Sequence, residues 1–284
     1  MDFSNELKKL LALEYRCPED AVDGAENFIT ISANRRGRKY DGDGGGFFSM
    51  ATMGGGCLIS ADERLMPFLR EFVKSGEGYR LFGEGRLAVL ERELDRFGYK
   101  LHELGAHHMF LPKYSVEPAR KFPLRRLELS EFKRFYGDRR FSNALCEEYD
   151  PERPDVAALA AMDGENIMGM AGASRDFTGT PNWLQIGIDV LPEYRGQGVG
   201  TFLVNELTKL ILESGDIPFY GTAPANIYSQ NIAINCGFRH AWVEICAEKK
   251  AADGGETSDD RTWVDDMKQE LEDYIEEQGI YIRQ

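Results

Sequence analysis

The most informative part of the chain reads Ile188-Asp189-Val190-Leu191-Pro192-Glu193-Tyr194-Arg195-Gly196-Gln197-Gly198-Val199-Gly200. It begins in the apolar run 183–190, which predicts a strand, and it leads into residues 201–213, which predict an amphipathic helix ended by Gly215. Glycines let a backbone approach a ligand closely, and the first N–H groups of a helix have no partner within the helix. Together with the positive end of the helix dipole, these groups predict an anion site.

The glycine pattern alone leaves two interpretations open, a phosphate-binding loop and a plain turn. A dinucleotide-binding unit would need a parallel series of strands, whereas the tight turn at Asp163-Gly164-Glu165-Asn166 predicts an antiparallel meander before the loop. Asp216 lies beyond the helix and not at the tip of a following strand. A Walker loop is excluded, because no Gly-Lys-Ser/Thr is present.

At these residues the chain resembles the GNAT superfamily of acetyl-CoA-dependent N-acetyltransferases. The family's pattern Val-x-Pro-x-x-Arg/Gln-x-x-Gly-x-Gly/Ala stands here as Val190, Pro192, Arg195, Gly198 and Gly200. A second block begins at Asn226-Ile227-Tyr228-Ser229, runs through Ala233 and ends at Gly237-Phe238, and it resembles the family's last signature helix. The resemblance covers roughly Phe122–Ala247 and implies an α/β (α+β) fold with a mixed central sheet flanked by helices.

Three parts of the chain are expected. A smaller α+β domain of unclear role occupies residues 1–112, the GNAT-like domain residues 113–248, and an acidic linker with an amphipathic helix residues 249–284. The boundary is placed in Pro112–Pro123, which holds three prolines. The apolar stripe of the last helix predicts packing on the chain itself, a homodimer contact or an arm for another partner.

The resemblance also implies an acetyl-CoA site. Its diphosphate would lie on the glycine loop, and its pantetheine arm would pair with the preceding strand and meet the later helix. The residues implied are Ile188, Val190, Arg195, Gly196, Gln197, Gly198, Val199, Gly200, Thr201, Asn226 and Ser229. For Asn226 and Ser229 an N-cap and first-turn role is equally expected, and both roles can hold together.

Amine acetylation by direct attack needs a base for the amine and an acid for the thiolate. Asp189 is the candidate base, although strand alternation places it opposite Ile188 and Val190 and favours a structural carboxylate. The family's tyrosine position falls on Ala233, and Tyr228 could replace it only if the helix were displaced. Water could also protonate the thiolate.

We therefore expect an acetyl-CoA-dependent N-acyltransferase that transfers acetyl to a primary amine. The alternative is a non-catalytic acyl-CoA-binding sensor or regulatory module. The formal charge of −14 favours a cationic acceptor, either a small-molecule amine or a lysine or N-terminal amine.

Composition and charge also bear on the binding partners, metal use and cellular location that we expect. The acidic balance disfavours nucleic acid and an anionic membrane surface, and no apolar run approaches the ~20 residues of a membrane span. Five dispersed cysteines and four histidines show no metal-ligand spacing, so no metal is expected. Reduced thiols and the absence of a secretory signal indicate the cytoplasm.

Overall fold

The computed structural model describes residues 1–32, 46–75, 78–102, 105–151, 153–176, 180 and 182–250. The helices are α1 (Ser4–Tyr15), α2 (Met66–Phe72), α3 (Glu84–Asp95), α4 (Leu129–Phe132), α5 (Val199–Glu213) and α6 (Ile227–Asn235). The strands are β1 (Phe28–Ile31), β2 (Phe48–Thr52), β3 (Cys57–Ala61), β4 (Tyr99–Leu101), β5 (His107–Pro112), β6 (Leu124–Arg126), β7 (Asp155–Asp163), β8 (Asn166–Arg175), β9 (Trp183–Val190), β10 (Ile217–Thr222) and β11 (Phe238–Lys249). The expected helix in the acidic tail lies outside the described residues.

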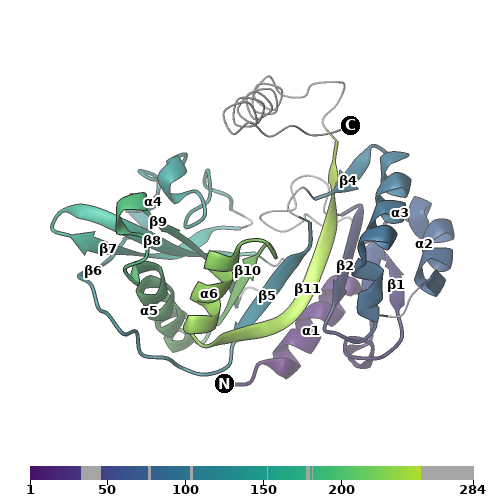
Figure 1. Ribbon diagram of the computed structural model, residues 1–284, viewed down its shortest axis with the longest axis horizontal. Coiled ribbons are helices and arrows are strands. Elements are labelled where there is room, and N and C mark those ends of the chain that lie inside the picture. The colour runs from purple at the N-terminus through teal and green to yellow at the C-terminus, as the bar shows by residue number, and fades with distance from the viewer. Residues whose placement is uncertain are drawn as a thin grey trace, which may run out of the picture. The chain divides into compact units, whose positions relative to one another are not determined.

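One mixed sheet runs through the described residues in the order β1-β3-β2-β11-β5-β10-β9-β8-β7-β6, and β4 pairs with β11 (Figure 1). The pairs β9–β10 and β1–β3 are parallel. The pair β7–β8 is an antiparallel hairpin around Gly164, as the sequence predicts. The expected mixed sheet flanked by helices is therefore confirmed.

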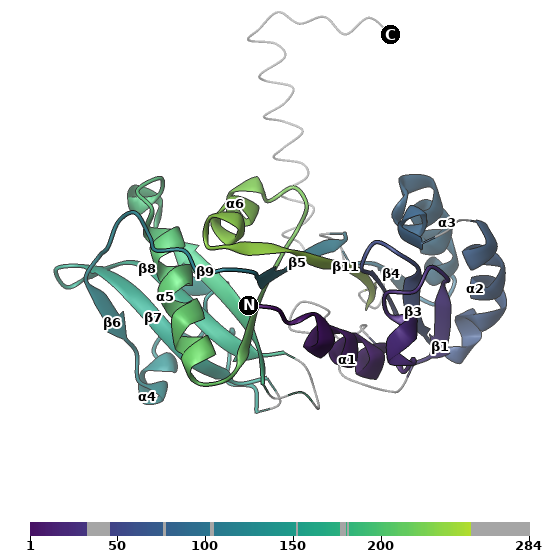
Figure 2. The same ribbon diagram turned by 90° about the horizontal axis from the view of Figure 1, so that it is seen from below.

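Helices cover both faces of the sheet (Figures 1 and 2). Phe202, Leu203 and Leu207 of α5 are buried against Ala171 of β8 and Ile186 of β9. α1 packs on the opposite face, against β5, β10 and β11, and α4 packs on that face over β7 and β8. α2 and α3 pack with β2, β3 and the end of β11. Because side chains alternate along a strand, each β9 residue faces either α5 or the α4 side.

β5 joins the two parts of the chain that the sequence suggests are separate. The expected boundary at residues 112–113 follows β5 directly, yet β5 lies between β10 and β11 and pairs antiparallel with both. Phe110 is the register partner of Tyr220 on one side and of His240 on the other. Met1–Lys249 accordingly form one compact unit, whose sheet continues across the boundary.

Candidate functional site

The parallel strands β9 and β10 separate part of the way along their length. Their register partners run from Trp183–Ile217 to Ile186–Tyr220. Beyond Ile186, β9 continues to Val190 paired with β8, and β10 continues to Thr222 paired with β5. The edge of β9 at residues 187–190 that faces β10 has no strand partner among the described residues. Apart from the carbonyl of Val190, which accepts Nε of Arg195, its backbone groups could pair with an extended ligand as if it were an added strand.

The glycine loop follows β9 after one 3-10 turn at Pro192–Tyr194, and it leads directly into α5. Gly196 and Gly198 have φ values of 73° and 93°, a left-handed conformation that glycine adopts without strain, and Gly198 is the N-cap of α5. The N–H groups of residues 196–201 donate to no atom of the described chain. These free donors, at the positive end of a 15-residue helix, could bind a diphosphate.

Two arginines reach this loop. Arg195 donates from Nε to the carbonyl of Val190 at 3.0 Å, so its side chain is turned toward the strand end. Arg120 donates from Nη1 to the carbonyl of Gln197 at 3.3 Å. The sequence analysis missed Arg120, because it lies in the segment treated as a domain boundary and belongs to no motif near the loop.

The start of α6 lies beside the end of β10. Asn226 accepts the N–H of Ser229 at 3.1 Å through Oδ1, which confirms its role as N-cap. Ser229 Oγ is hydrogen-bonded to the hydroxyl of Tyr220 at 2.7 Å. Burial raises the pKa of Tyr220 to about 12, so this hydroxyl keeps its proton at neutral pH. Tyr220 was also missed, since it reads as a core residue of a strand.

Asp189 points to the α4 side of the sheet, where a chain segment binds it. Its Oδ2 accepts the N–H groups of Asn143 at 2.8 Å and Ala144 at 2.9 Å, and its Oδ1 accepts Nδ2 of Asn143 at 2.7 Å. A Cβ built on Gly187 would lie 1.8 Å from the carbonyl oxygen of Asn143, and one on Gly172 equally close, at 1.8 Å, to that of Ala144. The segment therefore sits directly on the strands, and the geometry favours the structural role for Asp189.

Neither position considered for the catalytic acid holds a well-placed one. Ala233, at the position where the resemblance implies a tyrosine, is completely buried. Tyr228 lies in the first turn of α6 with 88% of its surface exposed. Cys236 also offers no nucleophile, because burial raises the pKa of its thiol to about 12.

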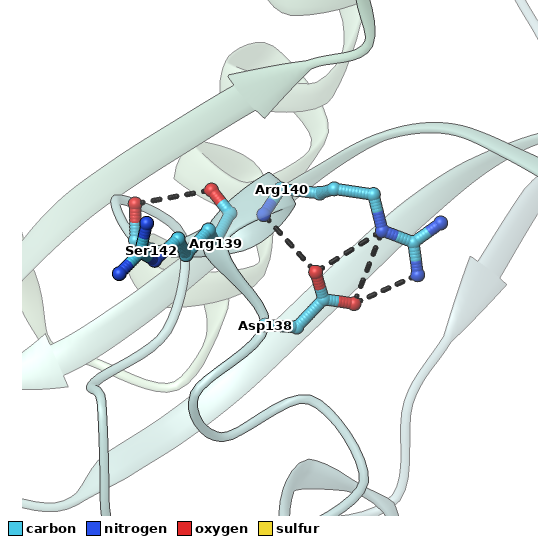
Figure 3. A network of polar contacts seen from close by, with 4 residues as sticks. All are labelled: Asp138, Arg139, Arg140 and Ser142. Carbon is cyan, nitrogen blue, oxygen red and sulfur yellow. Dashed lines mark hydrogen bonds and ion pairs between the residues drawn. The ribbon is translucent and has the colours of Figure 1, made fainter.

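A cavity of about 680 Å³ adjoins the segment that Asp189 holds, and residues 142 and 146 line it on either side of that segment. Asp138, in its wall, accepts Nη2 of Arg140 at 2.8 Å and the N–H of the same residue at 3.0 Å (Figure 3). These hydrogen bonds hold the pKa of Asp138 below its ordinary value. Glu147 and Glu148 line the cavity, are exposed, and form no ion pair with a described residue. Arg139 also lines the cavity without an ion pair to a described residue, so the unpaired side chains of the lining carry two negative charges and one positive charge.

Two other kinds of feature, metal-ligand groups and membrane-spanning helices, are absent from the described part of the chain. No group of three or more histidine, cysteine or acidic side chains there could hold a metal ion. No helix among those residues has the length and apolar character needed to cross a bilayer.

Comparison with known proteins identifies a family for part of the chain. Residues 122–238 match the model of the acetyltransferase (GNAT) family. Comparison with curated protein sequences finds no match. A solved GNAT-family acetyltransferase from Colwellia psychrerythraea is 14% identical, with a TM-score of 0.39 and coverage of 53% of this chain and 57% of that one. The match thus spans little more than half of the Colwellia protein.

Two further solved structures contain the coenzyme. An acetyltransferase-like protein from Salmonella typhimurium, solved with its cofactor acetyl-CoA, is 13% identical over 48% of this chain and 98% of that one, with a TM-score of 0.33. An aminoglycoside N-acetyltransferase in complex with CoA is 23% identical over 42% of this chain and 92% of that one, with a TM-score of 0.32.

Proposed function

We propose that the chain binds acetyl-CoA and transfers its acetyl group to a primary amine by direct attack, as the match of residues 122–238 to the GNAT acetyltransferase family model suggests. One observation carries this proposal. Within the matched residues, the unpaired edge of β9 leads straight into a loop whose N–H groups at residues 196–201 are free. A strand-like arm that ends in a diphosphate needs these two features next to each other.

The donor set of the loop fits the proposed coenzyme. The N–H groups of residues 196–201 would hold the diphosphate, with Arg195 nearby, and Ile188 and Val190 would pair with the pantetheine arm through their backbone. Asn226 and Ser229 would border that arm from the α6 side. Bound in this way, the coenzyme supplies an acetyl group already activated as a thioester.

For Asp189 we propose a positioning role and not that of a base. Its carboxylate already accepts three hydrogen bonds, and it fixes the segment that packs on β9. A catalytic base needs a free lone pair within hydrogen-bond reach of the amine proton. Tyr228 stays a candidate acid, and its high exposure favours water as the donor to the thiolate instead.

We propose that the acceptor is cationic, as the net charge of the chain first suggested. The cavity beside residues 143–145 supports this, because its two exposed carboxylates, Glu147 and Glu148, form no ion pair with a described residue and outnumber Arg139, the lining cation that is likewise unpaired among those residues. Its volume of about 680 Å³ lies within the ~300–1,000 Å³ of small-molecule pockets. Small-molecule polyamines and a lysine or N-terminal amine of a peptide both fit this chemistry.

The decisive experiment measures acetyl transfer with the full chain. Purified protein is given acetyl-CoA and a panel of cationic, neutral and anionic acceptors, and both thiol release and the mass of the product are followed. A reaction without acceptor corrects for hydrolysis. We expect acetylated product from cationic amines, and transfer confined to neutral or anionic acceptors would overturn the acceptor class.

The second candidate is a non-catalytic acyl-CoA sensor. The buried Ala233 and the three hydrogen bonds that Asp189 already accepts favour it, since neither position offers a well-placed group that could move a proton. Acetyl-CoA that raises the Tm without transfer to any acceptor of the panel would establish this candidate in place of the enzyme.

A further inference from the structure

The segment that connects β5 to β6 contacts α5 at two places. Lys209, in the third turn of the helix, forms an ion pair with Glu117 at 3.2 Å. Phe122 packs edge-on against Phe202, in the first turn, with ring centroids 5.5 Å apart. Both views of the fold show this segment passing beside α5 on its way between the two strands (Figures 1 and 2). The segment is therefore held at two points on the helix, in its first and third turns.

Arg120 lies between these two anchors and reaches the glycine loop. Its Nη1 donates to the carbonyl of Gln197 at 3.3 Å, and its Cδ lies 4.0 Å from the point where a side chain on Gly198 would begin. The aliphatic stem thus lies beside the N-cap of α5, and the guanidinium contacts the carbonyl of Gln197 in the loop that also carries the free N–H groups. Arg120 forms no ion pair with an acid of the described residues.

Each of the two arginines at the loop uses one donor on a backbone carbonyl. Arg195, which belongs to the family pattern, donates from Nε to Val190, and Arg120 donates from Nη1 to Gln197. A guanidinium has five N–H donors in a planar fork, and the described contact of Arg120 occupies one of them. The donors that stay free match the paired oxygens of a phosphate, which arginine binds in bidentate geometry.

We propose that Arg120 is a further phosphate-binding residue of this site. From the segment that connects β5 to β6, its guanidinium binds the diphosphate of the coenzyme. The proposal rests on the proposed function, because it needs a diphosphate at the loop. It commits to the diphosphate and not to the 3′-phosphate, since the contacts of Arg120 are to Gln197 and Gly198, within the loop itself.

The test measures Kd by isothermal titration calorimetry with the full chain and two ligands, CoA and dephospho-CoA. Arg120→Ala should weaken both about tenfold, the loss of one charge-assisted contact at an exposed site. Arg120→Lys should recover part of the loss. Lys121→Ala is the matched control, a neighbouring exposed cation, and should bind as the wild type does. Thermal unfolding of each unliganded variant checks that the fold is intact.

Each result separates this inference from the proposed function. If the wild type binds neither ligand, the proposed function fails together with the inference. If the wild type binds and Arg120→Ala binds equally well, the inference is overturned while the proposed function stands. A loss confined to CoA would place the 3′-phosphate at Arg120 and overturn the assignment to the diphosphate.

Discussion

Substitution of Asp189 separates a positioning role from that of a base. Three hydrogen bonds reach its carboxylate at 2.7–2.9 Å. A bond to a charged group contributes roughly 1.5–3 kcal/mol when it is shielded from water. Because Asn143 is exposed, water can replace part of these bonds, and we expect Asp189→Ala to cost about 2 kcal/mol in all. In a unit of this size 1 kcal/mol shifts the Tm by roughly 2–4 °C, so the Tm should fall by about 4–8 °C.

The assay pairs thermal unfolding with steady-state kinetics across pH. For Asp189→Asn, which keeps one acceptor oxygen, we expect about half the fall in Tm, a loss in kcat/KM of less than about tenfold, and a pH profile of unchanged shape. Asn143→Ala is the matched control. It removes the 2.7 Å contact and leaves the two backbone donors, so its Tm should fall less than that of Asp189→Ala.

A base would give the opposite pattern. Loss of a general base costs roughly 10²- to 10⁴-fold in rate and removes the acidic limb of the pH profile. Asp189→Asn with the Tm of the wild type, a rate lowered at least a hundredfold and a lost acidic limb would refute the positioning role.

Three further outcomes are expected. Tyr228→Phe should leave kcat within about twofold, because the side chain is 88% exposed, and a tenfold slower thiol release in single-turnover experiments would establish Tyr228 as the acid. The pair Glu147→Gln and Glu148→Gln should raise KM for a polyamine about threefold to tenfold and leave KM for acetyl-CoA unchanged, whereas an equal rise in both would contradict the acceptor site. Burial and the nearby His240 lower the pKa of His108 below its ordinary value of 6.5, so its contribution to stability is complete above pH 6.5 and is lost as the pH falls below it. Urea unfolding from pH 7 to pH 5 should therefore show a smaller acid-side loss in His108→Gln, and an equal loss in both proteins would contradict this.

The features that the sequence predicts well are those whose partners are near in the chain. The glycine loop, the helix after it and the N-cap at Asn226 all depend on contacts between residues a few positions apart. The same holds for the hairpin of β7 and β8, whose turn residues suit a tight connection. Periodicity and turn chemistry encode such contacts directly.

The features that the sequence does not predict depend on distant partners. β5 reads as the last strand of the N-terminal part, and nothing in its six residues indicates that β10 and β11 lie on either side of it. Arg120 meets Gln197 across 77 positions of the chain. Tyr220 and Ser229 read as a core residue and a first-turn residue, and their hydrogen bond follows from how α6 returns over β10.

The packing of residues 143–145 on β8 and β9 shows how such a distant contact can shape the site. β9 loses β10 as its partner beyond Ile186, and a strand edge without a partner is free to bend. On the α4 side, Gly172 and Gly187 admit the backbone of the segment, and Asp189 binds its N–H groups. The lost pairing along one edge is thus offset by packing on one face. Ile188 and Val190 alternate with Gly187 and Asp189 and pack on the α5 side. The strand is therefore held on both faces while its edge stays free for a ligand, and a site on a fixed strand is preorganised.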